Sequence, residues 1–303
     1  VLRRENPTHI AVGFDPHGPT FRHEAYERYK AQREETPEVI RESVPVIKDI
    51  IRAYNIPILE VEGYEADDVI GTLAKQAEKR GIITYMMTPD KDYGQLVSDT
   101  TFIYRPKYGD KEFEVMGVER VKEKFGIENT MQVIDLLGLM GDSSDNIPGC
   151  PGVGEKTAQK LIAQFGSIEN LLEKTDELKG ALKTKVEENK EKIIFSKFLA
   201  TIKTDVPIEL DMASLKREAV NEEELTRLFD FYELRALKER VKKNQQAPSL
   251  FDDFAPELKQ PATNAAKKTA QDGAIQGSLF DFFAGEDTGD EKKSSHFALK
   301  DMQ

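Results

Sequence analysis

The chain has 303 residues, of which 39% are apolar and 32% are charged, and its net charge at pH 7 is −12. This length allows two domains or one domain with appendages, and the acidic balance argues weakly against a simple basic nucleic-acid coat. A single cysteine, Cys150, excludes an intrachain disulfide and favours a reducing compartment. Since no apolar run approaches membrane-spanning length and no signal peptide is recognisable, we expect a cytoplasmic protein with no membrane partner.

The first 116 residues alternate between strand-like and helix-like segments. Apolar, β-branched runs predict buried strands at 8–14, 56–62, 82–88 and 101–105. Helical patterns cover 22–35, 38–54 and 65–80, and Pro45 predicts a kink or break in the second of them. This alternation indicates an α/β domain with a mainly parallel sheet flanked by helices.

The segment 22–35 differs from the other predicted helices because it is polar and basic and has little apolar face. Such a segment packs weakly on a core and is available to bind a ligand.

After residue 116 the pattern becomes helical, and after residue 243 it changes again. The composition of 244–303, rich in Ala, Gln, Lys, Asp and Gly, predicts a disordered linker with one short repeat, PSLFDDFA and GSLFDFFA. The expected helices are 117–125, 130–140, 155–165, 167–174, 185–203 and 221–243.

Acidic residues stand at the ends of these predicted elements, where parallel α/β sheets bind ligands. Each acid alone is commonly a helix cap or a turn former, but a cluster of them would repel unless cations neutralise it. Oxygen ligands without a Cys/His cluster favour Mg²⁺ or Mn²⁺ over Zn²⁺, and a pair of such ions serves phosphodiester hydrolysis. The eight acids are Asp15, Glu65, Asp67, Asp68, Asp90, Asp92, Asp142 and Asp145, the last two on one face if their turn is helical.

The stretch GDSSDNIPGCPGVGEKTA (141–158) imitates a nucleotide-binding P-loop. A P-loop needs Gly-x₄-Gly-Lys-Ser/Thr after a strand, whereas here a residue separates Gly154 from Lys156 and the preceding segment is helical. A hairpin between two helices fits better, because Gly152 and Gly154 let the backbone turn and approach a ligand closely. Amides at the next helix start, with Lys156 and Lys160 nearby, would meet phosphates.

Five segments together resemble the 5′-nuclease domain of bacterial DNA polymerase I, in the flap endonuclease superfamily. In order, they are FDPHGPTFRHEAYERYKAQR, EGYEADDVIGTLA, TPDKDYGQL, LMGDSSDNIPGCPGVGEKTA and LATIKTD, and the resemblance runs to about residue 243. It implies a PIN-like fold with a nuclease core at 1–116 that includes a helical arch at 20–36. A helical region with a helix-hairpin-helix element would follow at 117–243, before the linker at 244–303.

The resemblance also assigns roles to residues. Two divalent ions, Mg²⁺ or Mn²⁺, would be held by a first group, Asp15, Glu65, Asp67 and Asp68, and a second group, Asp90, Asp92, Asp142 and Asp145. Lys30 and Arg33 would act at the scissile phosphate, with Arg22 also on the DNA and Tyr29 stacking on a base. The hairpin would grip duplex DNA, with a K⁺ ion on its carbonyls, through Gly149, Gly152, Val153, Gly154, Lys156, Thr157 and Lys160.

The implied activity is a structure-specific 5′-3′ exonuclease and flap endonuclease, acting on DNA with 5′ flaps or nicks and on RNA primers. The setting would be replication and repair in the bacterial nucleoid, with polymerase domains following in a longer chain. The family's first catalytic aspartate and first strand would precede Val1, which indicates a fragment whose natural start is missing. A non-catalytic DNA-binding fragment and a stand-alone flap endonuclease therefore remain as alternatives.

The tail repeat has two interpretations. QGSLF, with Gln276, Leu279 and Phe280, resembles the short peptide by which bacterial proteins dock on the sliding clamp. The alternative is a set of sparse hydrophobic contacts in a disordered linker.

Overall fold

The computed structural model describes residues 5–106 and 113–246 of the chain. All of them belong to one compact unit, Val1–Pro248. The predictions for the tail, including those for Gln276, Leu279 and Phe280, lie outside the described residues. No helix in the described part of the chain is long and apolar enough to cross a membrane.

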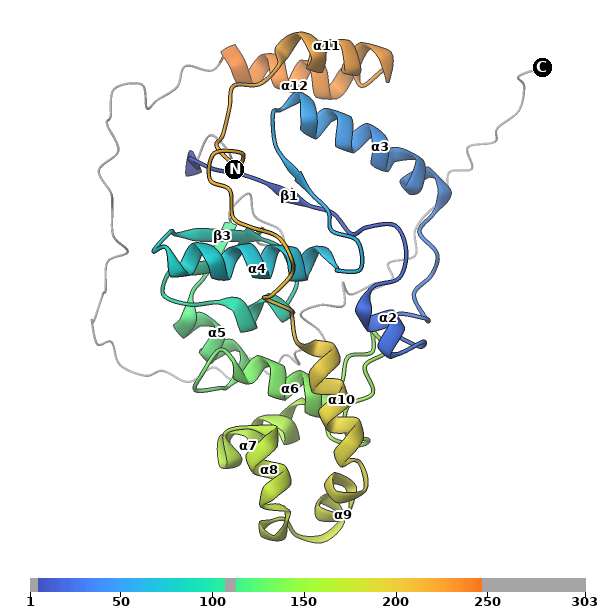
Figure 1. Ribbon diagram of the computed structural model, residues 1–303, viewed down its shortest axis with the longest axis vertical. Helices are drawn as coiled ribbons and strands as arrows, with labels where there is room; N and C mark the ends of the chain where they lie inside the picture. Colours follow the sequence, from blue (N-terminus) through green and yellow to red (C-terminus); the bar gives the residue numbers. More distant parts are fainter. Residues whose placement is uncertain (1–4, 107–112, 247–303) are drawn as a thin grey trace, which may run out of the picture. The chain divides into compact units, whose positions relative to one another are not determined.

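Two small sheets form the α/β part of the structure (Figure 1). β1 (Val12–Gly13) pairs in parallel with β2 (Ile58–Leu59), and β3 (Thr84–Met87) pairs in parallel with β4 (Thr101–Pro106). β5 (Phe113–Met116), which was not predicted, adds an antiparallel edge to β4. The α/β class and its mainly parallel pairing are confirmed, but no strand among the described residues joins β1 to β3, so the expected single sheet appears as two.

The predicted strand at 82–88 is only half-buried. Met86 is 3% exposed, whereas Ile83, Tyr85 and Met87 are each more than half exposed. The alternation follows from the two-residue period of a strand, because the described residues cover only one face of β3. The prediction of a fully buried strand was therefore wrong.

Three helices and a 3₁₀ turn accompany the strands. α3 (Glu38–Ala53) runs through Pro45 without the predicted break, and α4 (Ala66–Lys79) lies beside both sheets, followed after β3 by the 3₁₀ helix η1 (Asp92–Leu96). α2 (Phe21–Ala25) is much shorter than predicted. A segment with little apolar face gains little from packing, and after Ala25 the chain continues as turns.

The rest of the described chain is mainly helical, as predicted, except for residues 201–221, which contain no helix. The long segment expected at 185–203 is divided at Asn189, and the one expected at 221–243 is divided around Glu233, whose backbone has a left-handed φ of +54°. The helices are α5 (Val118–Phe125), α6 (Gln132–Met140), α7 (Glu155–Phe165), α8 (Ile168–Glu173), α9 (Gly180–Glu188), α10 (Lys190–Ala200), α11 (Glu222–Phe231) and α12 (Arg235–Gln246), with a 3₁₀ turn η2 (Thr175–Glu177).

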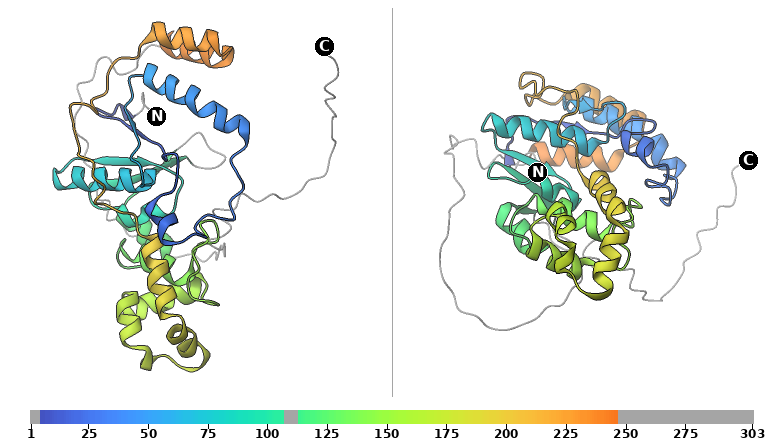
Figure 2. Two further views of the ribbon diagram at one scale, coloured as in Figure 1. Left: turned by 45° about the vertical axis from the view of Figure 1, so that its right-hand side comes forward. Right: turned by 60° about the horizontal axis from the view of Figure 1, so that its bottom comes forward.

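Two helical cores hold this region together. α6 is apolar along most of its length and packs against both α7 and α10, with Val133, Leu136 and Leu139 among its buried side chains. α11 packs instead against α3, where Leu225 and Phe229 meet Ala53, and both views in Figure 2 show α11 and α12 beside α3. The buried α6 thus presents the loop that follows it, which carries Asp142 and Asp145 of the predicted second group.

The loop after α6 crosses itself closely at two glycines, and this predicts a large stability effect. A Cβ on Gly149, whose φ is +59°, would lie 2.4 Å from the Gly141 nitrogen. We expect Gly149→Ala to lower the free energy of unfolding by about 3 kcal/mol, because it adds a clash to an unfavourable backbone conformation. Urea denaturation measures the change.

Gly180→Ala is the matched control. Gly180 has the same φ of +59°, but nothing lies within 4 Å of the added Cβ. Its replacement should cost about 1 kcal/mol, the backbone contribution alone. Equal losses in the two variants would contradict the close-contact explanation.

Candidate active site

Three of the predicted acids meet at the N-terminus of α4. Glu65 is the N-cap residue, and its backbone amide donates to Oδ2 of Asp68 at 3.1 Å. Asp15, beyond the end of β1, accepts a hydrogen bond from the Ala66 amide at 2.8 Å. The free amides and the dipole of the helix end favour negative charge there, which explains part of this gathering.

Arg22 fixes two of these acids in place. Its side chain is 3% exposed, and its guanidinium donates to Glu65 at 2.6 Å and to both oxygens of Asp68 at 2.8 and 2.9 Å. It also donates to the carbonyls of Leu199 and Thr201. The DNA contact predicted for Arg22 stays a prediction, and it would require these bonds to break.

Tyr29 joins the two predicted groups of acids. It is 4% exposed, and its hydroxyl lies 3.1 Å from Oε2 of Glu65 and 3.2 Å from Oδ2 of Asp145. Lys30 forms an ion pair with Glu65, and Arg33 forms one with Asp145. Burial alone would raise the pKa of Glu65, but Lys30 and Arg22 outweigh it and hold that pKa below its ordinary value.

The second group gathers where β3 ends and where the loop after α6 turns. Asp90 accepts a hydrogen bond from the Asp92 amide at 2.9 Å, and Lys91 forms an ion pair with Asp142 at 2.5 Å. Asp142 is also bridged to Ile147 in an antiparallel pattern, so its turn is not helical. The helical turn that would have put Asp142 and Asp145 on one face does not form, because backbone bonds between Asp142 and Ile147 close the turn instead.

Negative charge is only partly compensated in this site. Among the described residues, no ion pair joins Asp67, Asp90 or Asp92 to a basic side chain. Burial and then the nearby Asp90 raise the pKa of Asp67 to about 7, although its hydrogen bond from Tyr93 at 2.9 Å opposes the shift. The Oδ1 atom of Asp92 is buried and has no hydrogen-bond partner.

The donor set fits a hard divalent cation, although the acids are not gathered into a cage. Within the described ranges, no three His, Cys, Asp or Glu side chains form a group that could hold a metal ion. Basic groups stand between the acids instead, Lys30 on Glu65 and Lys91 on Asp142. A cation would satisfy the orphaned Asp92 oxygen and the charge on Asp67, and all-oxygen ligands suit Mg²⁺ or Mn²⁺.

Sequence reasoning did not identify Lys91 or Tyr93 as part of this site. Lys91 lies between two predicted ligands, Asp90 and Asp92, and that position was a usable signal. Tyr93 offered none, because its partner Asp67 is remote in sequence.

The predicted hairpin forms between α6 and α7. The Cys150 amide donates to the Leu139 carbonyl at 2.7 Å, and the Val153 amide turns back to Cys150 at 3.0 Å before α7 begins. Cys150 and Val153 are buried, whereas Lys156 and Lys160 are exposed. Burial raises the pKa of the Cys150 thiol, which suits the expected packing role. The DNA contacts of the hairpin remain predictions.

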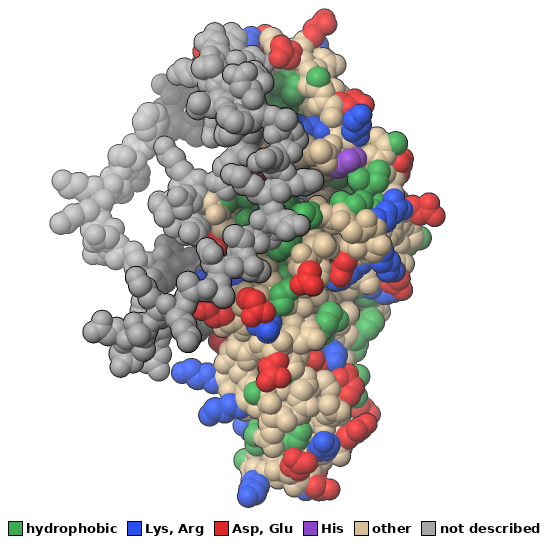
Figure 3. All heavy atoms as spheres, turned by 90° about the vertical axis from the view of Figure 1, so that its left-hand side faces the viewer, with side chains coloured by type: hydrophobic (Ala, Val, Ile, Leu, Met, Phe, Trp, Pro, Cys, Tyr) green, Lys and Arg blue, Asp and Glu red, His purple; other side chains and the backbone are tan. Residues whose placement is uncertain are grey.

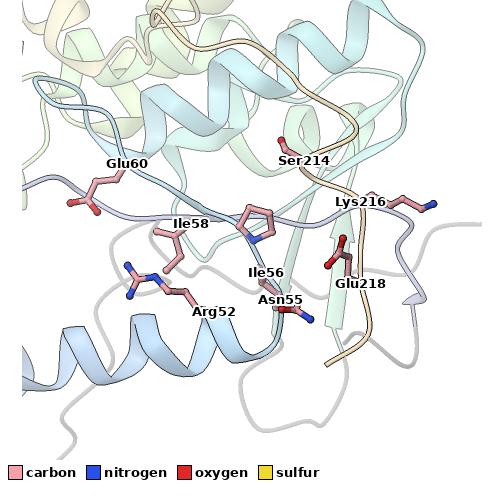
Figure 4. A pocket seen from close by; sticks show the side chains of 9 residues that line it. Arg52, Asn55, Ile56, Ile58, Glu60, Ser214, Lys216 and Glu218 are labelled. Carbon is pink, nitrogen blue, oxygen red and sulfur yellow. The ribbon is translucent and has the colours of Figure 1, made fainter. Parts of the chain in front are cut away.

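A separate groove of about 510 Å³ lies along β2 (Figure 4). Arg52, Glu60, Lys216 and Glu218 contribute charges of both signs to its lining. None of the eight acids lines it, so it is distinct from the candidate active site. Charges of both signs are also interspersed on the face seen in Figure 3, which shows no large surface of one sign.

Comparison with known families defines the class of this protein. The model of the 5′-3′ exonuclease N-terminal resolvase-like domain matches residues 1–126, and that of the 5′-3′ exonuclease C-terminal SAM fold matches residues 128–223. The class is thus a nuclease, a hydrolase with a resolvase-like part and a helical part. The chain belongs to the 5′-3′ exonuclease family.

Among curated proteins, the chain is similar to bacterial DNA polymerase I. It is 47% identical over 242 residues to the enzyme of Bacillus subtilis (strain 168), a match that covers 80% of this chain and 27% of that protein. With the enzyme of Mycobacterium tuberculosis (strain ATCC 25618 / H37Rv) it shares 39% identity over 241 residues, covering 80% of this chain and 26% of that protein. The chain therefore spans about a quarter of the length of these relatives.

Solved structures with the same fold come from bacteriophage T5. T5 5′-exonuclease with bound zinc superimposes with a TM-score of 0.57 at 21% identity, covering 76% of this chain and 86% of that one. The T5 flap endonuclease in a pseudo-enzyme-product complex with DNA and metal ions gives 0.58 at 20% identity, covering 77% and 87%. At this identity, the likeness concerns the fold.

The charge imbalance at Asp67 predicts a pH-dependent stability change. The folded pKa of about 7 exceeds the ordinary value of 3.8, so from about pH 4 to 7 the folded state binds the extra proton and wild-type stability falls as pH rises. Asp67→Asn removes this loss. With chelator present, we expect the variant to gain up to about 4 kcal/mol on the wild type between pH 4 and 7.5.

Urea denaturation at the two pH values measures this gain. Asp99→Asn, at an exposed aspartate, is the matched control. Its free energy of unfolding should differ from that of the wild type by the same amount at both pH values. A pH-independent difference for Asp67→Asn would contradict the electrostatic explanation.

Proposed function

We propose that this chain is a structure-specific 5′ nuclease that cuts phosphodiester bonds where a 5′ single-stranded flap meets duplex DNA. Its substrates would be DNA with 5′ flaps or nicks and RNA primers. The observation that carries the proposal is the convergence of acids from four separate segments, three of which, Asp67, Asp90 and Asp92, form no ion pair with a basic side chain among the described residues. Membership of the 5′-3′ exonuclease family supports it.

The metal centre would hold two divalent ions, Mg²⁺ or Mn²⁺. Asp15, Glu65, Asp67 and Asp68 would serve the first, and Asp90, Asp92, Asp142 and Asp145 the second. Bound ions would activate a water for in-line attack and stabilise the attacking and leaving oxygens.

The chain's own cations would complete the site. Lys30 and Arg33 would offset charge on the scissile phosphate and orient it, while Tyr29 would stack on a base of the single strand. Arg22, with its five hydrogen bonds, would position Glu65 and Asp68 before any DNA contact. Its measurable role would then be to hold these ligands in place.

The hairpin would set the register of the duplex without reading its sequence. Gly149, Gly152 and Gly154 would let the backbone come close to phosphates, and Lys156 and Lys160 would add positive charge. Hairpin carbonyls would hold a K⁺ ion. Val153, being buried, would act through its backbone.

The wider role follows from the relatives, which are much longer. We propose that the chain is the N-terminal part of a bacterial DNA polymerase I that acts in primer removal and repair in the cytoplasm. The sliding clamp would then dock on Leu279 and Phe280.

Replacing one proposed ligand should separate cleavage from binding. In the full-length protein, Asp142→Asn should lower Mg²⁺-dependent cleavage of a 5′-flap substrate by about 100-fold or more, because a metal ligand loses its charge. Flap binding, measured by anisotropy in Ca²⁺, should change less than about threefold, since phosphate contacts carry affinity.

Asp176→Asn is the control for this experiment. Asp176 is an exposed aspartate paired with Lys183 in the helical region, so its replacement should alter neither flap cleavage nor flap binding. Cleavage by Asp142→Asn at the wild-type rate would contradict the assignment of Asp142 as a metal ligand of a nuclease.

The hairpin lysines predict a second, salt-dependent effect. Lys160→Ala should weaken binding of all flap sequences alike and reduce the slope of log K against log salt concentration by about 1, because one phosphate contact is lost. Lys79→Ala, at the opposite end of α4 from the acids, is the charge-matched control and should leave the slope unchanged. An unchanged slope for Lys160→Ala would exclude the hairpin from the contact surface.

A further inference from the structure

The segment 26–33, which we name the strap, lies across the loop 142–146. Its backbone is fastened at both ends of the contact, because the Lys30 amide donates to the Asp145 carbonyl at 3.0 Å and the Asn146 side chain donates to the Arg28 carbonyl at 2.6 Å. Arg33 Nε donates to the Ser144 carbonyl at 3.2 Å. These bonds tie the predicted arch to the loop that carries Asp142 and Asp145.

Side chains of the strap also occupy the proposed metal ligands. Tyr29 and Lys30 both reach Glu65, and Lys30 Nζ lies 3.7 Å from Oδ2 of Asp145. Arg33 forms an ion pair with the other oxygen of Asp145, Oδ1. Every carboxylate oxygen of Glu65 and Asp145 therefore has a strap group within ion-pair or hydrogen-bond distance.

A carboxylate lone pair cannot serve an ammonium group and a metal ion at once. The strap cations supply the positive charge that a metal would bring, and they do so on one acid from each proposed group. Asp67 and Asp92 form no hydrogen bond or ion pair with the strap, and Oδ1 of Asp92 is buried without a partner. The strap thus forms ion pairs with Glu65 and Asp145, but it forms none with Asp67 or Asp92.

Polar contacts rather than apolar ones hold most of the strap in place. Apart from Tyr29, its side chains are exposed or half-buried, and Arg33 is 53% exposed. Lys30 has a left-handed φ of +55°, which a residue with a side chain adopts only when its surroundings enforce it. Segments with few buried apolar contacts open locally at small free-energy cost.

We propose that the strap is an autoinhibitory latch, in which Tyr29, Lys30 and Arg33 compete with divalent metal ions for Glu65 and Asp145. Metal binding releases the strap, and release frees the same three side chains to contact the single strand. The inference rests on the proposed metal site, and it adds that the site and the strap are mutually exclusive partners. In the described structure the strap keeps Tyr29 buried and pairs Lys30 and Arg33 with Glu65 and Asp145.

The test combines metal affinity with amide exchange. Mn²⁺ alone is titrated into the full-length protein by calorimetry, and hydrogen–deuterium exchange of the peptide covering 26–35 is followed with and without saturating Mn²⁺. We expect Arg33→Gln and Lys30→Gln each to bind Mn²⁺ about tenfold more tightly than the wild type, since one competing bond is lost. Wild-type strap exchange should rise about tenfold or more with Mn²⁺, because the Lys30 amide loses its acceptor.

Arg28→Gln is the matched control. Arg28 lies in the same strap and its replacement removes the same charge, but its side chain is exposed and forms no ion pair among the described residues. Its Mn²⁺ affinity should stay within about twofold of the wild type. Exchange in α6 should not respond to Mn²⁺ in any variant.

The experiment distinguishes failure of the latch proposal from failure of the proposed metal site. If Mn²⁺ binds but leaves strap exchange unchanged, or if Arg33→Gln and Lys30→Gln match Arg28→Gln in affinity, the latch is overturned and the metal site stands. If Mn²⁺ binds neither the wild type nor any variant, the proposed metal site and the latch are both overturned. Binding by Lys30→Gln where the wild type shows none would be the strongest support.

Discussion

The ion pairing of buried carboxylates is the constraint on which the rest of this structure depends. Arg22 reaches from α2 to Glu65 and Asp68 and also bonds the backbone at the end of α10, so one side chain ties α2 to α4 and to α10. A buried carboxylate without such a partner carries a large desolvation cost. No ion pair meets this requirement at Asp67 or Asp92 among the described residues, and a cation at the proposed site would meet it.

The positions of the acids could be predicted because topology fixes them. Acids at strand ends and at a helix start were expected to serve one ligand site, and Asp15 does reach the start of the helix that carries Glu65. Their partners could not be predicted in the same way. Whether Lys91 reaches Asp142, or Tyr93 reaches Asp67, depends on side-chain contacts between segments that no local pattern encodes.

The failures in the fold have a similar cause. Helical propensity favoured a long helix from residue 22, but the chain leaves the helix after Ala25 because hydrogen bonds to the loop 142–146 replace helical ones. The spacing of Asp142 and Asp145 left a helical turn open, yet the loop closes through backbone bonds instead, and Gly141 and Gly149 let it cross itself closely. In both places, tertiary bonds outweighed local propensity.

The adjacency of the strap, the acids and the hairpin has a mechanical consequence. α6 is buried along most of its length, and one connection from it carries Asp142, Asp145 and then the hairpin that leads into α7. The Gly149 amide is anchored to Ser196 of α10, so the hairpin and the acid-bearing turn cannot shift independently. A duplex held at the hairpin would therefore be held at a fixed distance from Asp145, the residue on which the strap closes. The proposed grip, cleavage site and latch would thus share one connection, which is held by the packing of α6 and by the bond from Gly149 to Ser196 of α10 rather than by the acids themselves.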